Sequence, residues 1–523
     1  MAFHNTGWYD NLSDGVVYIG KCLYAFKGEM PENTSVIVQE GTVHIVSSAF
    51  SGCTGLTSVE IPSSVTSIDS NAFSDCNGLK KVIVSDIAAW CGISFDNYKS
   101  NPLYYAMHLY SDADTEITQL VIPPSVTTIG YSAFYNCTGL TSVEIPSSVT
   151  KIRNIAFSGC TSLAKVTINS NAILSATTIR NNLTTVFGSQ VSEYVLGNEV
   201  TRIGEYAFYG CTGLTTVTLP PSVKVIERQV FQNCSNIERV NISDINAWMR
   251  IKFTDGRSNP TFWSASLHLN GEEVTEVTVP ESITELGDQV FKGMKNLKTI
   301  KMHDGITSIG ACAFQGCFSL QSFEWPKSLR HIGSGAFHQC RSFDKVDLSN
   351  TEVDSIPDVV FYMCYNLTDV TLQANLKYLG ERAFGTDTCL VRITSYIKDP
   401  TALMPQSYNR LPFNTFDTSG FILENQPIYR KATLYVPKGT AEAYRQSVAF
   451  ANFENIVEME GGTSNGDANG DGEVNITDIT YVLDKINGKP SGDFVEEAAD
   501  ANSDGEINIT DVTVILDIIN SAK

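Results

Sequence analysis

Two short acidic segments near the end of the 523-residue chain carry the residue types best suited to chemistry. They run from Asp467 to Asp478 and from Asp500 to Asp511, and their starts lie 33 residues apart. In each segment, side chains with oxygen atoms occupy positions 1, 3, 5, 9 and 12, and glycine occupies position 6. A hard cation needs several oxygen ligands and a chain that turns sharply around it. The spacing therefore predicts two calcium-binding loops.

The expected calcium ligands are spread along both loops, with a backbone carbonyl contributed at position 7. They are Asp467, Asn469, Asp471, Glu473, Asn475 and Asp478 in the first loop, and Asp500, Asn502, Asp504, Glu506, Asn508 and Asp511 in the second. This is the pattern of an EF-hand loop, except that Asp stands at position 12, where Glu is usual. No amphipathic helix precedes the first loop. A charge run alone is typical of a solvated tail, but two matched registers favour the metal site.

The loops lie in a segment that differs in charge from the rest of the chain. From Asp467 onward it holds thirteen acidic residues against three lysines, nearly half of the net charge of -21. Like charges at this density oppose compaction, so we expect calcium binding to be coupled to folding. The small polar residues at 461–466 are expected to form a flexible linker.

Most of the first 390 residues repeat with a period near 23. Each unit contains an Ala-Phe or Val-Phe pair, usually followed three residues later by Cys. The phenylalanines of these pairs are Phe50, Phe73, Phe134, Phe157, Phe208, Phe231, Phe291, Phe314, Phe337, Phe361 and Phe384. A fixed period with apolar residues in the same slots indicates a solenoid whose units stack on one another.

Each repeat is expected to contribute one strand and one tight turn. Leu140, Val143 and Ile145 follow strand spacing, and Pro146 ends the strand because it cannot donate to a sheet ladder. A helical or 3₁₀ turn should then bring Phe157 into the core. The repeat cysteines are expected to be buried, reduced thiols, although the sequence leaves disulfides between neighbouring coils open. They are Cys53, Cys76, Cys137, Cys160, Cys211, Cys234, Cys317, Cys340 and Cys364.

The polar residues between the inward positions of the strands should form columns on the outer face of a parallel sheet. Repeat proteins use such extended faces to bind ligands, although a merely solvated face is the alternative. The densest mixed-charge group, and our candidate ligand face, is Lys301, Glu324, Lys345, Asp347 and Asp369.

The predicted fold is a β-rich solenoid with short 3₁₀ or helical turns, followed by a small α-helical module. The expected divisions are an N-terminal cap at 1–40, the solenoid at 41–395, a C-terminal cap at 396–460, the linker, and the acidic module at 467–523. The second cap should contain a short helix that starts at Thr440.

Two related insertions, near 85–118 and 243–276, share Ser-Asp-x-x-x-Trp and Ser-Asn-Pro marks. They are expected to pack onto the solenoid through Trp90, Phe95, Trp248 and Phe253. Residues 169–200 lack these marks, and we interpret them as degenerate repeat material.

The repeat, the two insertions and the ending at residues 432–439 together resemble the BspA-like bacterial leucine-rich repeat proteins, over about residues 5–460. The resemblance implies a leucine-rich repeat solenoid on a secreted or surface-attached protein. It also implies a role in adhesion to host matrix or to other cells, without naming the ligand, because fold does not imply function.

The acidic module resembles the type I dockerins, which have two loop-helix halves and Asp at position 12. This resemblance implies docking to a cohesin module on a scaffold or surface protein. By position, it implies recognition through Ile476, Thr477, Leu483 and Asp484, and through Ile509, Thr510, Leu516 and Asp517. The two sets are identical in residue type, so either face could dock.

Other functions fit the sequence less well. The negative charge argues against nucleic acid, and no apolar run is long enough to span a bilayer. The N-terminus has neither the basic nor the apolar region of a signal peptide. The rest of the chain favours an extracellular protein whose signal peptide is not part of this sequence. No carboxylate pair, His or Cys arrangement indicates an enzyme.

The leading hypothesis is a non-enzymatic adhesion protein that binds a host or bacterial protein or glycan. The alternatives are an accessory component of a polysaccharide-degrading assembly and a spacer without its own ligand.

Overall fold

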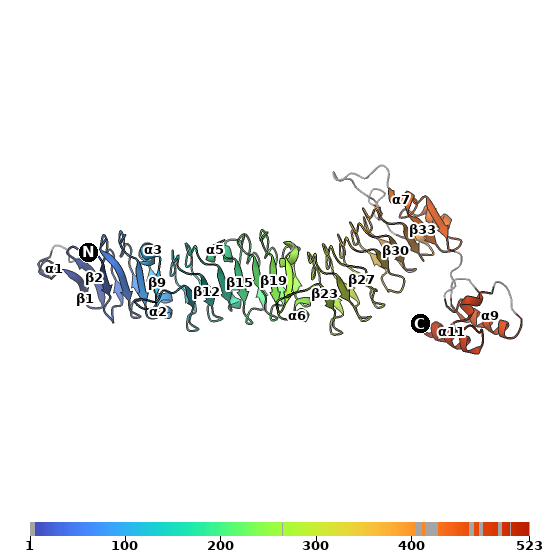
Figure 1. Ribbon diagram of the computed structural model, residues 1–523, viewed down its shortest axis with the longest axis horizontal. Helices are drawn as coiled ribbons and strands as arrows, with labels where there is room; N and C mark the ends of the chain where they lie inside the picture. Colours follow the sequence, from blue (N-terminus) through green and yellow to red (C-terminus); the bar gives the residue numbers. More distant parts are fainter. Residues whose placement is uncertain are drawn as a thin grey trace. The chain divides into compact units, whose positions relative to one another are not determined.

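The computed structural model describes residues 6–263, 265–403, 411–413, 427–459, 465–469, 474–489, 494–502 and 504–521. It divides into two compact units, and each is described by itself. The first comprises Met1–Phe323 and Gly333–Arg341, and the second comprises Glu324–Ile332 and Ser342–Lys523. Both contain stacked coils of short parallel strands (Figure 1), which confirms the predicted β solenoid.

Coils of the first unit contribute strands to three sheets, which are parallel except for one antiparallel pair at the end of the second sheet. The first sheet holds β3 (Thr34–Ile37), β5 (Leu56–Ile61), β7 (Lys81–Val84) and β9 (Leu109–Tyr110). The second holds β10 (Gln119–Val121), β12 (Ser142–Ile145), β14 (Lys165–Ile168), β15 (Glu193–Leu196), β17 (Thr216–Thr218), β19 (Arg239–Ile242), β21 (Ser266–Leu269) and β22 (Glu272–Glu273). A further pair joins β23 (Glu276–Thr278) to β25 (Thr299–Lys301). Equivalent residues of successive repeats lie opposite each other, as Val143 and Val166 do.

A second, shorter strand in most coils forms a separate set of sheets. These strands are β4 (His44–Ile45), β6 (Ser67–Ile68), β8 (Ser94–Phe95), β11 (Thr128–Ile129), β13 (Lys151–Ile152), β16 (Arg202–Ile203), β18 (Val225–Ile226), β20 (Lys252–Phe253), β24 (Glu285–Leu286) and β26 (Ser308–Ile309). At the N-terminus, α1 (Gly7–Asp10) precedes an antiparallel hairpin of β1 (Gly15–Ile19) and β2 (Cys22–Lys27). The hairpin joins the short strands because β2 pairs with β4.

The second unit continues the same coil design. Its strands are β27 (His331–Ile332), β28 (Lys345–Asp347), β29 (Ser355–Ile356), β30 (Asp369–Leu372), β31 (Tyr378–Leu379), β32 (Arg392–Ser395), β33 (Thr433–Val436) and β34 (Asn455–Glu458). Its short helices are η2 (Pro400–Ala402), α7 (Pro427–Lys431) and α8 (Ala441–Gln446).

The predicted helix near Thr440 is present, but Thr440 does not cap it through its side chain. The Thr440 hydroxyl instead donates to the Pro437 carbonyl at 2.7 Å. A Glu458 carboxylate oxygen accepts the Ala441 N–H at 3.0 Å. This interaction lowers the pKa of Glu458, because backbone N–H groups stabilise its ionised form.

The repeat phenylalanines stack along the core of each unit. Ring centroids lie 5.2 Å apart for Phe134 and Phe157, and 5.0 Å apart for Phe208 and Phe231. The Phe134 N–H donates to the Ala156 carbonyl of the next coil at 2.8 Å. The same slot therefore supplies both an aromatic contact and a backbone bond between coils.

Eight of the nine repeat cysteines are buried as predicted, whereas Cys53 is half-buried. All thirteen cysteines of the chain lie in its described part and are free thiols. The Cys160 thiol donates to the Phe134 carbonyl of the preceding coil at 3.2 Å, and Cys234 donates in the same way to Phe208 at 2.9 Å. Burial raises the pKa of Cys160 to about 12, so this thiol stays protonated and unreactive.

Both insertions pack onto the solenoid as expected. The first contains α2 (Ile87–Gly92) and α3 (Leu103–Ala106), and the second contains α6 (Ile245–Met249) and η1 (Pro260–Trp263). Trp90 and Trp248 are buried, and each lies against a buried phenylalanine, Phe95 or Phe253, with centroids 5.5 and 5.4 Å apart.

The duplicated Trp supplies a hydrogen bond that an ordinary coil makes with its backbone. The Trp90 indole N–H donates to the Ala133 carbonyl at 2.8 Å, and that of Trp248 donates to Val290 at 2.9 Å. In regular coils, the residue before the Phe instead receives the Phe N–H of the preceding coil. The insertions displace that donor, and the indole replaces it.

Residues 169–200 form one irregular coil. Here α4 (Asn171–Ser175) and α5 (Leu183–Phe187) stand where other coils have a short strand, while β15 keeps its place in the long sheet. Phe187 continues the core stack, with its ring 5.0 Å from that of Phe157.

Candidate functional site

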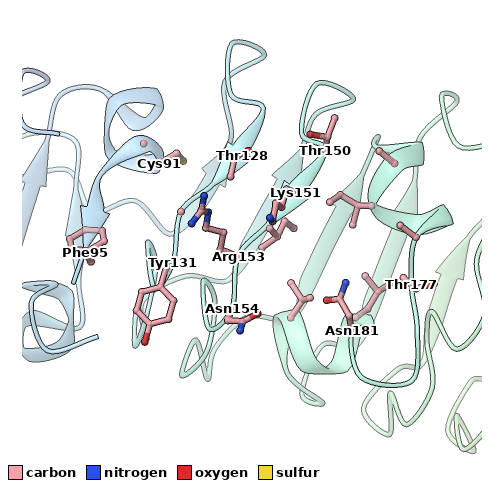
Figure 2. A pocket seen from close by; sticks show the side chains of 18 of the residues that line it. Cys91, Phe95, Thr128, Tyr131, Thr150, Lys151, Arg153, Asn154, Thr177 and Asn181 are labelled. Atoms are coloured by element: carbon pink, nitrogen blue, oxygen red, sulfur yellow. The ribbon is translucent and has the colours of Figure 1, made fainter. Parts of the chain in front are cut away.

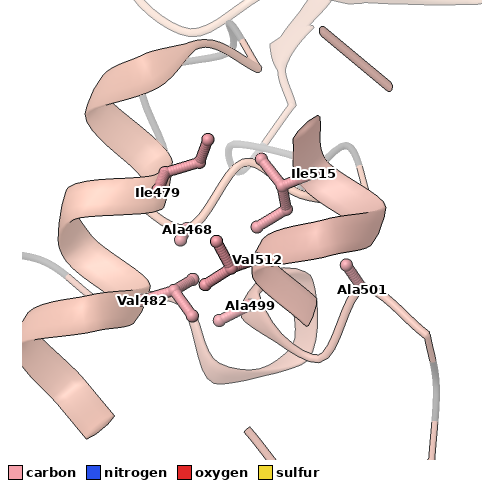
Figure 3. Close-up of a cluster of buried hydrophobic side chains, with 7 residues drawn as sticks. All are labelled: Ala468, Ile479, Val482, Ala499, Ala501, Val512 and Ile515. Atoms are coloured by element: carbon pink, nitrogen blue, oxygen red, sulfur yellow. The ribbon is translucent and has the colours of Figure 1, made fainter. Parts of the chain in front are cut away.

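The acidic module consists of two loop-helix halves around a small core. Its helices are α9 (Ile476–Ile486), α10 (Glu496–Ala499) and α11 (Ile509–Ser521), with α9 packed on α11. Figure 3 shows the core side chains Ala468, Ile479, Val482, Ala499, Ala501, Val512 and Ile515 converging between the helices. Ala468 and Ala501 both stand at position 2 of their loops, so each loop contributes one small residue to the shared core.

Backbone bonds tie the start of the first loop to the segment before the second. The Gly466 N–H donates to Ala498 at 2.8 Å, and the Val495 N–H donates to Ala468 at 3.0 Å. The Asn465 amide donates to the Ala501 carbonyl at 2.6 Å. The two halves therefore form one structural unit.

The aspartates at position 12 make the same contacts in both loops. Asp478 accepts the N–H groups of Asn469 at 3.1 Å and Asn475 at 2.8 Å. Asp511 accepts those of Asn502 at 3.2 Å and Asn508 at 2.8 Å. Both side chains belong to residues with 0% exposure. Each carboxylate thus joins positions 3 and 9 of its loop at the start of the following helix.

The asparagines at position 9 begin the two helices. Asn475 accepts the Thr477 N–H at 2.8 Å, and Asn508 accepts the Thr510 N–H at 2.9 Å. Such bonds satisfy N–H groups that have no partner within the helix. They also fix the backbone next to the predicted metal ligands.

The second loop is further shaped by its first residue. Asp500 accepts the N–H groups of Asp504 at 3.0 Å and Gly505 at 2.8 Å. Gly505, at position 6, has φ +85°, a left-handed conformation that favours glycine. The loop therefore turns at the position where the calcium pattern requires it.

The donor set of the loops fits a calcium ion. It consists of carboxylate and amide oxygens without thiol or imidazole groups, which is the chemistry that a hard cation prefers. Asp471 and Glu473 lie outside the described residues. Within those that are described, no three acidic, His or Cys side chains form a metal cluster.

The residues implied in cohesin recognition lie mostly on the outside of α9 and α11. Ile476 and Ile509 are 68% and 62% exposed, although both are large and apolar. Thr477, Thr510, Leu516 and Asp517 are also exposed, while Leu483 and Asp484 are half-buried.

Two further exposed residues, Thr480 and Thr513, lie beside these positions and were not among those expected from the sequence. They are exposed and stand four residues after Ile476 and Ile509, so they follow on the same helix face. Their hydroxyls donate to the carbonyls of Ile476 and Ile509, each at 3.3 Å. The helical spacing was the signal that could have identified them.

The candidate ligand face of the solenoid falls into separate parts. In the second unit, Lys345 lies directly opposite Asp369, and the Lys345 ammonium is 3.6 Å from the Asp347 carboxylate. Lys301 is an exposed residue at the end of β25, in the first unit.

Glu324 is exposed but does not lie on a strand, contrary to the expected register. The flanking residues differ from those of other repeats, because Phe323 and Trp325 replace smaller β-branched residues. Trp325 packs edge-on against Phe343, with centroids 6.4 Å apart. Pro326 stands in a slot that proline also fills after regular strands, as Pro146 does, so the two rings are what sets this coil apart.

Family comparisons agree with this architecture. The model of the BspA type leucine-rich repeat region matches in six copies, over residues 14–100, 108–182, 177–253 and 266–391. The model of the dockerin type I domain matches residues 465–520. Both resemblances drawn from the sequence are thereby confirmed. Among the described residues, no helix is both long enough and apolar enough to cross a bilayer.

Several solved structures are similar to the chain. A leucine-rich cell surface protein from Faecalibacterium prausnitzii is 22% identical, with a TM-score of 0.33. The match covers 72% of this chain and 90% of that protein. A leucine-rich repeat protein from Bacteroides ovatus is 20% identical, with coverages of 74% and 94% and a TM-score of 0.35. The pneumococcal vaccine antigen PcpA is 16% identical, with coverages of 84% and 92% and a TM-score of 0.31. A comparison with curated proteins gives no match.

Proposed function

Because the chain belongs to the BspA-type leucine-rich repeat family and ends in a type I dockerin domain, we propose that it is a non-enzymatic extracellular binding protein. In this proposal the calcium-loaded dockerin docks to a cohesin module on a scaffold or surface protein. The solenoid displays the surface that recognises a protein or glycan ligand. Both families are binding modules typical of secreted or surface proteins, which supports an extracellular location.

The observation that carries the docking role is the exposure of matched apolar residues on two equivalent helix starts. Ile476 and Ile509 each stand two residues before a buried position-12 aspartate. Covering an exposed apolar side chain with a partner surface removes it from water, which favours binding. The equivalence of the halves supports two alternative docking orientations.

Calcium bound in the two loops would fix the starts of α9 and α11, which carry these surfaces. Each loop would hold one ion, through the ligands at positions 1, 3, 5, 9 and 12 and the carbonyl at position 7. The ion would offset the repulsion between the Asp500 and Asp511 carboxylates and their neighbours. Calcium binding and the docking surface are therefore linked, because the last ligand of each loop lies in the first turn of the docking helix.

Cohesin capture by the full chain tests this function. Immobilised type I cohesin modules should retain the protein in calcium and release it with a chelator. The double variants Ile476→Asp with Thr477→Asp, and Ile509→Asp with Thr510→Asp, should each still bind through the untouched half. Combining all four changes should abolish capture, while the exposed control Glu497→Gln should leave it unchanged.

Two results would contradict the docking proposal: capture that persists in the fourfold variant, or capture that is indifferent to chelator. A type II cohesin panel run in parallel would show whether isoleucine at position 10 selects a different cohesin class.

A second reading of the solenoid, that of a spacer, is favoured by one observation. On the candidate ligand face, the Lys345 ammonium is 3.6 Å from the Asp347 carboxylate, and Lys345 stands opposite Asp369 on the neighbouring strand. Charges that neutralise one another in this way present little net field to a partner. If Lys301→Ala and Lys345→Ala leave every bound ligand unchanged, this sheet face only extends the assembly.

A further inference from the structure

A cavity of about 900 Å³ lies in the first unit, between the first insertion and the irregular coil. Its floor is formed by β11 and β13, one wall by residues 91–96, and the other by residues 172–186. Figure 2 shows Lys151 on β13 and Arg153 just after it, between Cys91 and Phe95 on one side and Thr177 and Asn181 on the other. We call this cavity the groove.

The groove exists because the short-strand sheets are interrupted on both sides of its floor. β11 and β13 form a two-stranded sheet of their own, flanked by the insertion and by α4. The Gly130 N–H bonds to the Cys91 carbonyl at 2.9 Å, and the Gly204 N–H bonds to Leu174 at 2.8 Å. A Cβ at either glycine would come within 2.8 Å of those carbonyl oxygens. Close glycine contacts therefore hold the walls against the coils beside them.

Three basic side chains line the groove: Lys151, Arg153 and Arg180. All are exposed, and within the described part of the chain their side chains make no hydrogen bond or ion pair. The one acidic lining residue, Asp96, already accepts hydrogen bonds from the Ser70 N–H at 3.1 Å and hydroxyl at 3.2 Å. The groove is thus a cationic site on a protein with a net charge of -21.

Comparison with other coils shows that Arg153 departs from the repeat. In two other coils, the first residue of a short strand pairs with an acidic residue just after the short strand of the next coil. His44 pairs with Asp69 at 2.9 Å in this way, and Arg202 pairs with Glu227 at 2.9 Å. Arg153 stands in the slot of those acids, so here the repeat adds a cation where other coils supply its partner.

The other side chains of the groove favour a hydroxyl-rich ligand. Within the described part, the side-chain amides of Asn154 and Asn181 make no hydrogen bond, and each can both donate and accept. Tyr131 adds a half-exposed aromatic ring. An arginine guanidinium binds a carboxylate through two parallel hydrogen bonds.

We propose that the groove binds an acidic oligosaccharide, one whose sugar rings carry carboxylate groups. Lys151, Arg153 and Arg180 bind the carboxylates, the amides of Asn154 and Asn181 bind sugar hydroxyls, and Tyr131 packs against a sugar ring. This inference rests on the proposed role of the solenoid as the ligand-binding part, but not on cohesin docking.

Isothermal titration of the full chain with hexameric oligogalacturonate tests the proposal. The parent protein should bind, with an affinity that falls as salt is raised, and should not bind the neutral cellohexaose. Arg153→Glu and Arg180→Ala should each weaken binding about tenfold or more, as expected for loss of a charge-assisted hydrogen bond. Arg228→Ala, which removes an exposed arginine outside the groove, should bind like the parent.

The proposal is overturned if oligogalacturonate does not bind, if groove variants with unchanged thermal midpoints bind as the parent does, or if hexaglutamate binds equally well. Arg180→Ala keeps the test decisive should Arg153→Glu fail to fold, because Arg180 lies outside any helix or strand. Cohesin capture of the same variants reports the proposed function separately, since groove changes should leave it intact.

Discussion

Asp387 occupies a slot in the core that most other repeats fill with cysteine, three residues after Phe384. The residue is 0% exposed, and its Oδ1 accepts the Cys364 N–H at 2.8 Å. Its Oδ2 is buried without a hydrogen-bond partner in the described structure. Burial raises the pKa of this carboxyl well above its ordinary value of 3.8, because a charge cannot be solvated there.

Asp387→Cys should stabilise the solenoid, and the gain should grow with pH. A buried polar atom without a partner costs about 1–3 kcal/mol, which the thiol avoids at any pH. The folded pKa is raised, so the stability of the neutral acid is fully present below 3.8 and is lost as pH rises toward the folded pKa. Across that window the parent should lose about 1.4 kcal/mol per pH unit relative to the variant.

Urea unfolding of the full chain, followed by circular dichroism at pH 5, 6 and 7 in constant calcium, measures this difference. The variant is compared with the parent at each pH, so that the other titrating groups cancel. Asp387→Asn removes the charge but keeps the shape of the side chain. Its free energy of unfolding relative to the parent should rise with pH at the same slope as that of Asp387→Cys, with a smaller pH-independent gain. Asp354→Asn is the matched control, since its exposed carboxylate lies 3.0 Å from the Lys377 ammonium. A gain for Asp387→Cys that does not change with pH would refute the reasoning.

Two further predictions concern the insertions and the calcium loops. Trp90→Phe should keep an aromatic ring but leave the Ala133 carbonyl with the Asn101 amide, at 3.3 Å, in place of the indole donor, lowering the free energy of unfolding by about 1 kcal/mol. Thermal unfolding measures this, and Tyr396→Phe, which removes the hydroxyl of an exposed tyrosine, should change nothing. Asp511→Ala should weaken calcium binding and reduce the calcium-dependent helical signal, measured by titration calorimetry and circular dichroism. An undiminished affinity for both ions would exclude Asp511 as a ligand.

The repeat slots could be read from sequence because one physical rule fixes each of them. Phe134 must stack on Phe157, and Cys160 must fit beneath a carbonyl, so residue type and spacing predict burial. The rule failed where the spacing changed. Phe187 continues the same stack, but it belongs to a coil whose short strand is replaced by helices, so its position does not follow the period.

Side-chain partners between neighbouring coils were harder to predict than burial. The helix at Thr440 begins where expected, but Glu458 from a later strand supplies its capping contact. Glu324 follows the spacing of a strand residue, yet it does not lie on a strand in the coil where Phe323 and Trp325 replace smaller residues. Whether a polar residue is used depends on what the next coil places beside it, and a single repeat does not contain that information.

Repetition and its interruption serve opposite purposes in this chain. In the dockerin, the two halves keep the same contacts at Asp478 and Asp511, and the proposed result is two interchangeable docking faces. In the solenoid, some coils pair a cation with the acid of the next coil, as Arg202 pairs with Glu227. The first insertion and the irregular coil break this series, and the slot of the acid between them holds a second cation. Arg153 lies between two such breaks, and for this reason the groove, rather than the regular sheet face, is where the solenoid can become selective.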